Sequence, residues 1–183
     1  VMAAGIVAIA ADLRRSRPLA IVLFWLNVLF FGVLWMLYVV RLFRFPRDFF
    51  ADLADHGRGV GFFNAIAATC VMASGCIAIY GQIRIAMILW IVGIVLWIVL
   101  TYSIFTIFTI KKNKPDLEHG INGGWLVTVV AMQSISVVAC QRAPVFHERR
   151  DIVLFFALTI WLAGGMLYIW MISLIFYRYT FFP

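Results

Sequence analysis

The most informative part of the chain is GFFNAIAATCVMASGCIAIY, which runs from Gly61 to Tyr80. It carries no charged side chain, and a helix of about 20 residues is about 30 Å long, the thickness of a bilayer's hydrocarbon core. More than half of its residues are Gly, Ala, Ser, Thr or Cys. Because small residues allow close packing between membrane helices, this sequence predicts a transmembrane helix surrounded by other helices or bordering a cavity.

The composition of the whole chain agrees with a membrane protein. Of its 183 residues, 65% are hydrophobic and 13% are charged, and the mean hydropathy is +1.03. A soluble domain is about half apolar and about one quarter charged. The net charge is +7, but Lys and Arg lie in the links between apolar runs. Contact with lipid headgroups is the ordinary reason for this pattern, so we expect membrane lipid and not nucleic acid as a partner.

Six apolar segments divide the chain into what we expect to be a single transmembrane domain fragment, 1–183. The link 41–60 mixes charged residues with Phe, and Pro46 marks a helix start, so it predicts a short interfacial helix. The first segment is too short to span a bilayer, and we expect it to be the remainder of a helix that begins upstream. The predicted segments are 1–11, 19–40, 61–80, 85–110, 121–140 and 152–177.

The segments form a repeat of light and heavy helices. The first, third and fifth segments begin near residues 1, 61 and 121 and contain four aromatic residues, whereas the other three contain 18. Lipid accommodates any large apolar side chain, but tight packing requires small ones. We therefore predict three helical hairpins whose light helices lie inside and whose heavy helices face lipid, with most tryptophans of the heavy helices exposed.

The sequence offers little evidence for catalysis. No charged residue lies inside an apolar segment, the histidines lie in links, and no phosphate loop or zinc pattern appears. We therefore predict no enzyme activity, no catalytic residue, no metal and no cofactor. The acidic and basic residues of 48–58 are the nearest approach to an active site, and a membrane enzyme with a polar site there stays an alternative.

Amides, hydroxyls and small residues are the candidates for a weakly polar pore. In the fifth segment, Asn122, Gln133, Ser136 and Cys140 are spaced to share one helical face, where they would either hydrogen-bond between helices or line a pore. Arginines at the ends of the segments would attract anions. The pore-lining candidates are Gly5, Asn64, Ala68, Gly75, Asn122, Gln133, Ser136 and Cys140, and the candidates at the pore mouths are Arg14, Arg15, Arg41 and Arg58.

Three stretches carry a family resemblance. VMAAGIVAIA at 1–10, RLFRFPRDFFADLADHGRGVGFFNAIAATCVMASG at 41–75 and HGINGGWLVTVVAMQSISVVA at 119–139 resemble the tellurite-resistance/C4-dicarboxylate transporter family. That family includes the slow anion channels of plant guard cells and yeast malate and sulfite carriers. The resemblance implies an all-α membrane fold of about ten helices in five hairpins, with odd helices around a pore and even helices outside.

The resemblance also implies a trimer in the plasma (inner) membrane, with 41–60 and 111–120 on the cytoplasmic side.

This sequence departs from the family pattern in two ways. Only three of the five hairpins are present, and the family's occluding phenylalanine belongs to an absent ninth helix, so Phe62 and Phe63 should not inherit that role. Relatives often bend odd helices at proline, and no light segment here contains one.

The function that we expect is therefore part of an anion channel or transporter for small anions or organic acids such as malate, by passive or gated permeation. The alternatives are the membrane enzyme described above and a non-transporting membrane scaffold or sensor. The links on the two sides hold seven and eight basic residues, so charge alone does not set the orientation.

Overall fold

The computed structural model describes residues 1–182, apart from the side chains of His119 and His147. It is helical throughout, with no strand among these residues. The α-helices are α1 (Met2–Leu13), α2 (Arg17–Arg44), α3 (Pro46–Leu53), α4 (Phe63–Tyr80), α5 (Ile83–Ile110), α6 (Leu117–Gly120), α7 (Leu126–Arg142) and α8 (Arg150–Phe181). Short 3₁₀ helices occupy Gly59–Phe62, Gly123–Trp125 and Ala143–Arg149.

Five helical segments of the described residues are long and apolar enough to cross a membrane. They are Arg17–Arg44, Gly59–Tyr80, Ile83–Ile110, Gly123–Phe146 and Arg150–Phe181, and Met2–Leu13 is a shorter apolar helix. Together they form a multi-pass integral membrane protein, which confirms the expected all-α membrane class.

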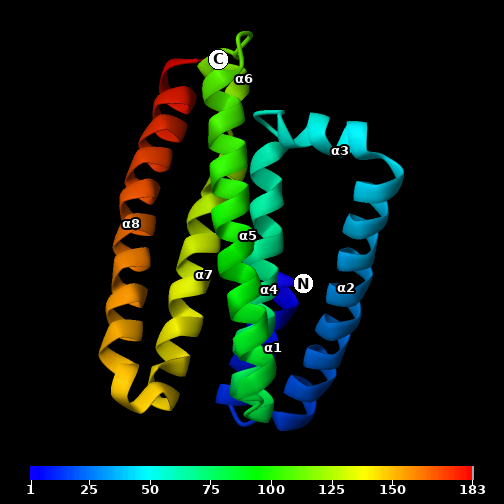
Figure 1. The fold of residues 1–183 in the computed structure, drawn as a ribbon, viewed down its shortest axis with the longest axis vertical. Helices are drawn as coiled ribbons and strands as arrows, with labels where there is room; N and C mark the ends of the chain where they lie inside the picture. The colour runs from blue at the N-terminus through cyan, green and yellow to red at the C-terminus, as the bar shows by residue number, and fades with distance from the viewer. Residues whose placement is uncertain (183) are drawn as a thin grey trace.

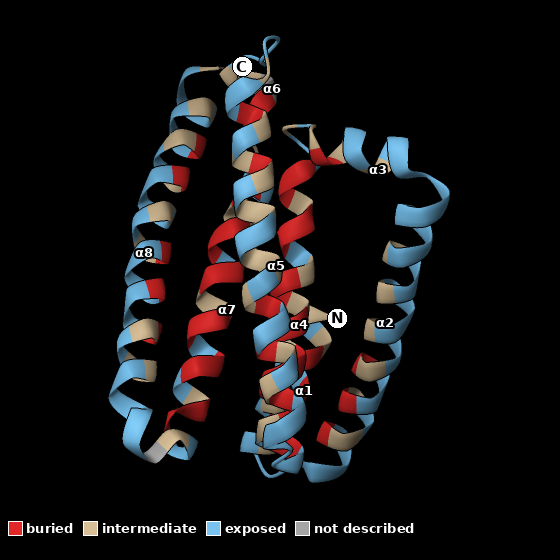
Figure 2. Cartoon of the chain, viewed as in Figure 1, coloured by how far each residue is buried: buried red, intermediate tan, exposed pale blue. Residues whose placement is uncertain are grey.

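Three hairpins stand side by side in two layers (Figure 1). The inner helices pack in the order α1, α4, α7, and each outer helix packs mainly on its own hairpin partner, α2 on α1, α5 on α4 and α8 on α7. Burial follows the same division (Figure 2): 67% of the most apolar window of Gly59–Tyr80 is buried, against 17% for α2, α5 and α8. The light helices are therefore the inner ones.

The small residues of α4 allow its neighbours to approach closely. Cys70 is buried against α5, where a Cβ atom added to Gly93 would lie 2.8 Å from the Cys70 sulfur. The bulky residues of α4 are also buried, since Phe63 and Ile66 are among the largest fully buried side chains. Helix α4 is thus enclosed on nearly all sides, as its composition predicts.

The connection between α4 and α5 depends on one glycine. Gly81 has φ of +63°, in the left-handed region that favours glycine. In this conformation the Gly81 N–H donates to the Ile77 carbonyl at 3.0 Å and the Gln82 N–H donates to the Cys76 carbonyl at 2.9 Å. These two bonds cap α4 and let α5 begin at Ile83, antiparallel to α4.

Of the six tryptophans of the outer helices, three are exposed (Trp25, Trp161 and Trp170), two are half-buried (Trp35 and Trp97) and one is buried (Trp90). Trp25 and Trp161 are exposed, at 59% and 56%, as predicted for lipid-facing residues. Trp90 is buried instead: its indole N–H donates to the Ile135 carbonyl at 3.1 Å, and its ring packs edge-on against Phe156. Trp90 is therefore an exception to the prediction that most of these tryptophans face lipid, because α5 turns this edge toward α7 and α8.

Replacement of Trp90 by alanine should destabilise the bundle by about 3 kcal/mol, because it removes a buried ring and leaves a cavity between α5, α7 and α8. The matched change Trp161→Ala, on an exposed face, should have an effect within about 0.5 kcal/mol. Unfolding in detergent micelles, followed by circular dichroism, measures both. Equal destabilisation by the two substitutions would contradict the packing described for Trp90.

Candidate functional site

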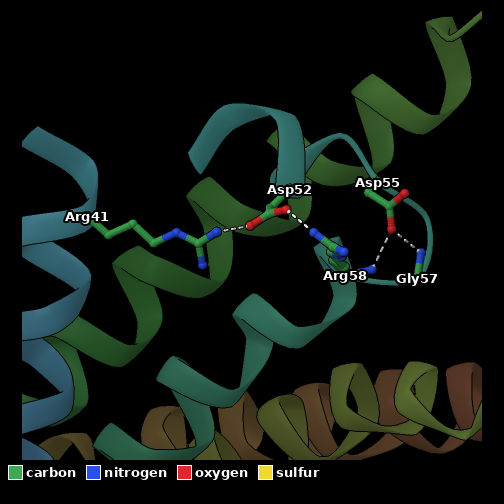
Figure 3. A network of polar contacts seen from close by, with 5 residues as sticks. All are labelled: Arg41, Asp52, Asp55, Gly57 and Arg58. Atoms are coloured by element: carbon green, nitrogen blue, oxygen red, sulfur yellow. Dashed lines mark hydrogen bonds and ion pairs between the residues drawn. The ribbon is translucent and has the colours of Figure 1, made fainter. Parts of the chain in front are cut away.

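A charged network links α2, α3 and the loop that precedes α4 (Figure 3). The Asp52 carboxylate lies between two guanidinium groups, pairing with Arg41 and, at 3.0 Å, with Arg58. The hydrogen bond from Arg58 is the main reason why the pKa of Asp52 is held below its usual value. Asp52 thus ties the end of α2 to the loop that precedes α4.

A second carboxylate, that of Asp55 in the loop between α3 and α4, accepts hydrogen bonds from the backbone of this loop. Asp55 accepts hydrogen bonds from the backbone N–H of Gly57 at 3.0 Å and of Arg58 at 2.9 Å. Asp52 and Asp55, two of the acidic residues of 48–58 that suggested an enzyme, therefore stabilise the loop. Arg41 and Arg58, candidates for a pore mouth, share one carboxylate and present less positive charge than two free arginines would.

The same loop docks on α5 through an aromatic contact. His56 stacks on Phe108 with ring centroids 4.1 Å apart, and the Lys111 ammonium donates to the Ala54 carbonyl at 3.0 Å. Burial, followed by the charge of Lys111, lowers the pKa of His56. The histidine is therefore kept neutral and serves as part of the hydrophobic contact between loop and helix.

Replacement of Asp52 by asparagine should release Arg41 and Arg58 and accelerate amide hydrogen exchange across 46–62. Asp48→Asn is the matched control, because Asp48 is an exposed α3 residue with no ion pair in the described part of the chain. Acid should act like the substitution: because the pKa of Asp52 is lowered, its stabilisation is present at neutral pH and is lost as pH falls below about 4. Unchanged exchange in Asp52→Asn would mean that the ion pairs do not hold the loop.

Asn64 and Ala68 line a cavity of about 320 Å³ between α1, α2 and α4. Its other walls are mainly apolar, and the aromatic side chains of Phe31, Trp35 and Tyr38 face it from α2. A second cavity of about 470 Å³ lies next to the charged network and includes Arg41, Asp52 and Arg58 in its lining. Asn64 and Ala68 therefore adjoin open space, but on the side of α4 that faces α2.

Gly5 and Gly75 lie in helix contacts and not on an open face. An added Cβ atom at Gly5 would lie 2.5 Å from Val71 and 2.9 Å from the Asn27 amide, and one at Gly75 would lie 3.1 Å from the Phe24 ring. Both glycines are buried and receive side chains of α2. The absence of a side chain at both positions serves close packing here, and their pore-lining role stays a prediction.

The four residues of the fifth segment that were predicted to share one helical face occupy three different settings. Asn122 precedes the helix with φ of −144°, and its side chain accepts a hydrogen bond from the Gly124 N–H at 2.8 Å. The helical spacing that placed it beside Gln133 therefore does not apply. Gln133 donates to the Trp161 carbonyl at 3.1 Å, and Ser136 donates to the Ala157 carbonyl at 2.7 Å, so both bond to α8. Of the two roles left open, the bonds observed are those of helix packing.

The contact between Gln133 and α8 requires a glycine. A Cβ atom added to Gly164 would lie 2.7 Å from the Gln133 amide nitrogen, whereas one added to Gly165 would meet nothing within 4 Å. Gly164→Leu should therefore displace Gln133 and cost roughly 1–3 kcal/mol, because the close contact of α7 and α8 is overpacked. Gly165→Leu, one residue away, should be nearly neutral. Resistance to denaturation by sodium dodecyl sulfate distinguishes the two variants, and identical resistance would refute the predicted contact.

Cys140 belongs to the uncovered face of α7. Val130 and Val137, seven residues apart on one side of the helix, are 46% and 51% exposed, and Cys140 is exposed as well. The other two cysteines are buried in α4.

Arg14 and Arg15 are exposed in the link between α1 and α2 at the lower end of the bundle, opposite Arg41 and Arg58 (Figure 1). The four arginines therefore belong to two different ends.

The structure also identifies a residue that sequence reasoning placed in a loop. Arg142 lies in the last turn of α7 and is only 2% exposed, inside the apolar span Gly123–Phe146. The guanidinium donates to the Ile83 carbonyl at 2.8 Å and lies over the Phe146 ring. The polar residues that follow it suggested an exposed link, and no signal in the sequence marked Arg142 as buried.

The sequence was compared with known proteins. A family model described as voltage-dependent anion channel (SLAC1) matches residues 1–183. Two uncharacterized transporters of Methanocaldococcus jannaschii are similar to the chain, MJ0762 at 26% identity and MJ0576 at 28% identity, each over 98% of the chain. The matches cover 54% and 53% of these two proteins, so the chain spans about half the length of the curated relatives it matches. No solved structure matches the chain.

Proposed function

Because the chain belongs to the voltage-dependent anion channel family, we propose that it forms part of a membrane path for small anions or for organic acids such as malate. The structural observation that carries the proposal is the layering of the bundle. Small-residue helices α1, α4 and α7 form one contiguous row, and α2, α5 and α8 each back onto it. A row of this kind is suited to border a path, because the outer helices leave one face of α7, with Val130, Val137 and Cys140, uncovered.

The mechanism that fits these residues is passive or gated permeation. Fixed positive charges at the ends of the path raise the local concentration of anions. Neutral walls offer weak contacts that let an ion leave again. Arg14 and Arg15 serve this role at the lower end of the bundle, and Arg41 and Arg58 serve it at the upper end, with part of their charge compensated by Asp52.

The wall of the proposed path includes the uncovered face of α7. Val130, Val137 and Cys140 are exposed on that face. Asn64 and Ala68 line a separate cavity, on the side of α4 that faces α2, and would border the path only if it extends there. Gln133 and Ser136 support the wall from behind, since their hydrogen bonds to α8 fix the position of α7.

The complete transporter is the unit to which this function applies. We expect it to be a homo-oligomer, a trimer by family resemblance, in the inner (plasma) membrane. Its upper end in Figure 1, where α3 and α6 lie, would face the cytoplasm.

Anion flux through the complete protein in liposomes tests the proposal. Purified protein should release chloride or malate down a gradient faster than protein-free liposomes, without an added energy source. A folded protein that releases neither chloride nor malate nor another small monovalent anion would support the scaffold or sensor alternative and reject the transport function.

Reaction of the native Cys140 should obstruct the path. A charged, membrane-impermeant thiol reagent should modify Cys140 and spare Cys70 and Cys76, which are buried. Modification should lower anion flux roughly twofold or more, as expected for a bulky charged group in an ion path. Cys140→Ser should conduct normally and resist the reagent. Complete labelling of Cys140 with unchanged flux would remove this face of α7 from the proposed wall.

A further inference from the structure

The buried Arg142 carries a charge that helix packing does not require. In the described part of the chain no carboxylate pairs with it, and its Nε–H has no hydrogen-bond partner. Its hydrogen bond within the described part of the chain goes to the Ile83 carbonyl, and the N–H of a neutral amide side chain could donate to that carbonyl equally well. Burying an unpaired guanidinium is costly, and arginine does not lose its proton in proteins. The charge itself therefore requires an explanation.

The direction of the inner helices provides an explanation for the charge of Arg142. Helices α1, α4 and α7 are parallel, because each hairpin returns the chain to the same end, and their C-terminal ends all lie at the lower end of the bundle (Figure 1). Each C-terminal end carries about half a negative charge from the aligned peptide dipoles. Three such ends side by side would repel an anion. Neither α1 nor α4 has a basic residue in its last turn, although the exposed Arg14 follows α1 directly as its C-cap, whereas α7 has the buried Arg142.

The burial of Arg142 makes its charge effective over a longer range than that of a surface arginine. Exposed charges are screened by salt over about 8 Å at physiological ionic strength, and buried charges are screened much less. Arg149, on the same end, is exposed. Ser74 donates to the Gln141 side chain at 2.8 Å, which links α4 to α7 one residue before Arg142, and the guanidinium itself is held at the start of α5 by its bond to the Ile83 carbonyl.

We propose that Arg142 is a buried fixed charge that, together with the exposed Arg14 and Arg15, makes the lower end of the inner layer selective for anions over cations. This role rests on the proposed anion path. Arg142 compensates the negative helix ends of α1, α4 and α7 by its field, while its hydrogen bond to Ile83 holds it in position. It does not need to contact the ion.

The reversal potential of the complete transporter in planar bilayers with asymmetric potassium chloride tests this role. Arg142→Gln keeps a donor for Ile83 and removes the charge, so the ratio of chloride to potassium permeability should fall by roughly 3- to 10-fold. Arg142→Lys should retain most of the ratio. Arg149→Gln, which removes an exposed charge from the same end, should leave it unchanged.

A titratable variant separates charge from folding within one protein. In Arg142→His the permeability ratio should increase as pH is lowered from about 8 to about 5.5, because the imidazole gains its charge over that interval. The wild type should show little change. A wild type that conducts chloride selectively, together with Arg142→Gln and Arg142→His variants that match it at every pH, would overturn the role of Arg142 alone. A folded wild type that carries no anion current would reject the proposed function and this role with it.

Discussion

Helix α4 contacts four other helices, and it does so through positions that leave no space for larger side chains. A Cβ atom added to Gly93 would lie 2.8 Å from the Cys70 sulfur, and one added to Gly5 would lie 2.5 Å from Val71. One added to Gly75 would lie 3.1 Å from the Phe24 ring. In a bilayer the lipid tails are as apolar as the side chains, so helices associate by van der Waals contact and not by escape from water. Close contact at α4 therefore positions α1, α2, α5 and α7 directly, and α8 through α7.

The polar groups of the bundle also join helices to one another. Within the membrane region of the described chain, Gln133 and Ser136 bond to backbone carbonyls of α8, and Trp90 bonds to a carbonyl of α7. Each bond joins an inner helix to an outer one, and those of Trp90 and Ser136 satisfy donors that would otherwise be buried without a partner. Charged side chains gather at the two ends, where Asp52 compensates arginines at one end and Arg142 has only a carbonyl partner at the other. The two ends therefore differ in their electrostatic environment.

The sequence predicted the layering well, because residue size decides packing in lipid. The light and heavy segments became inner and outer helices, and membership of the anion channel family confirms the resemblance that the sequence suggested. Individual residues were harder to place. The glycines Gly5 and Gly75 were assigned to a pore, but a glycine is equally suited to a helix contact, and only the position of α2 decides between them. Asn122 was placed on a helical face that begins several residues later. Arg142 was assigned to a loop, because its burial depends on the turn between α4 and α5, which is remote in sequence.

The hairpin organisation also has a consequence for biogenesis. Each outer helix packs mainly on the inner helix that precedes it in the chain, so most contacts of a hairpin form between segments made in succession. A short, glycine-capped connection such as that at Gly81 keeps the two helices near each other from the moment the second is made. Contacts between neighbours in sequence incur little loop-closure entropy and form early. The bundle can therefore grow during translation one hairpin at a time, with each new inner helix docking on a row that is already in place.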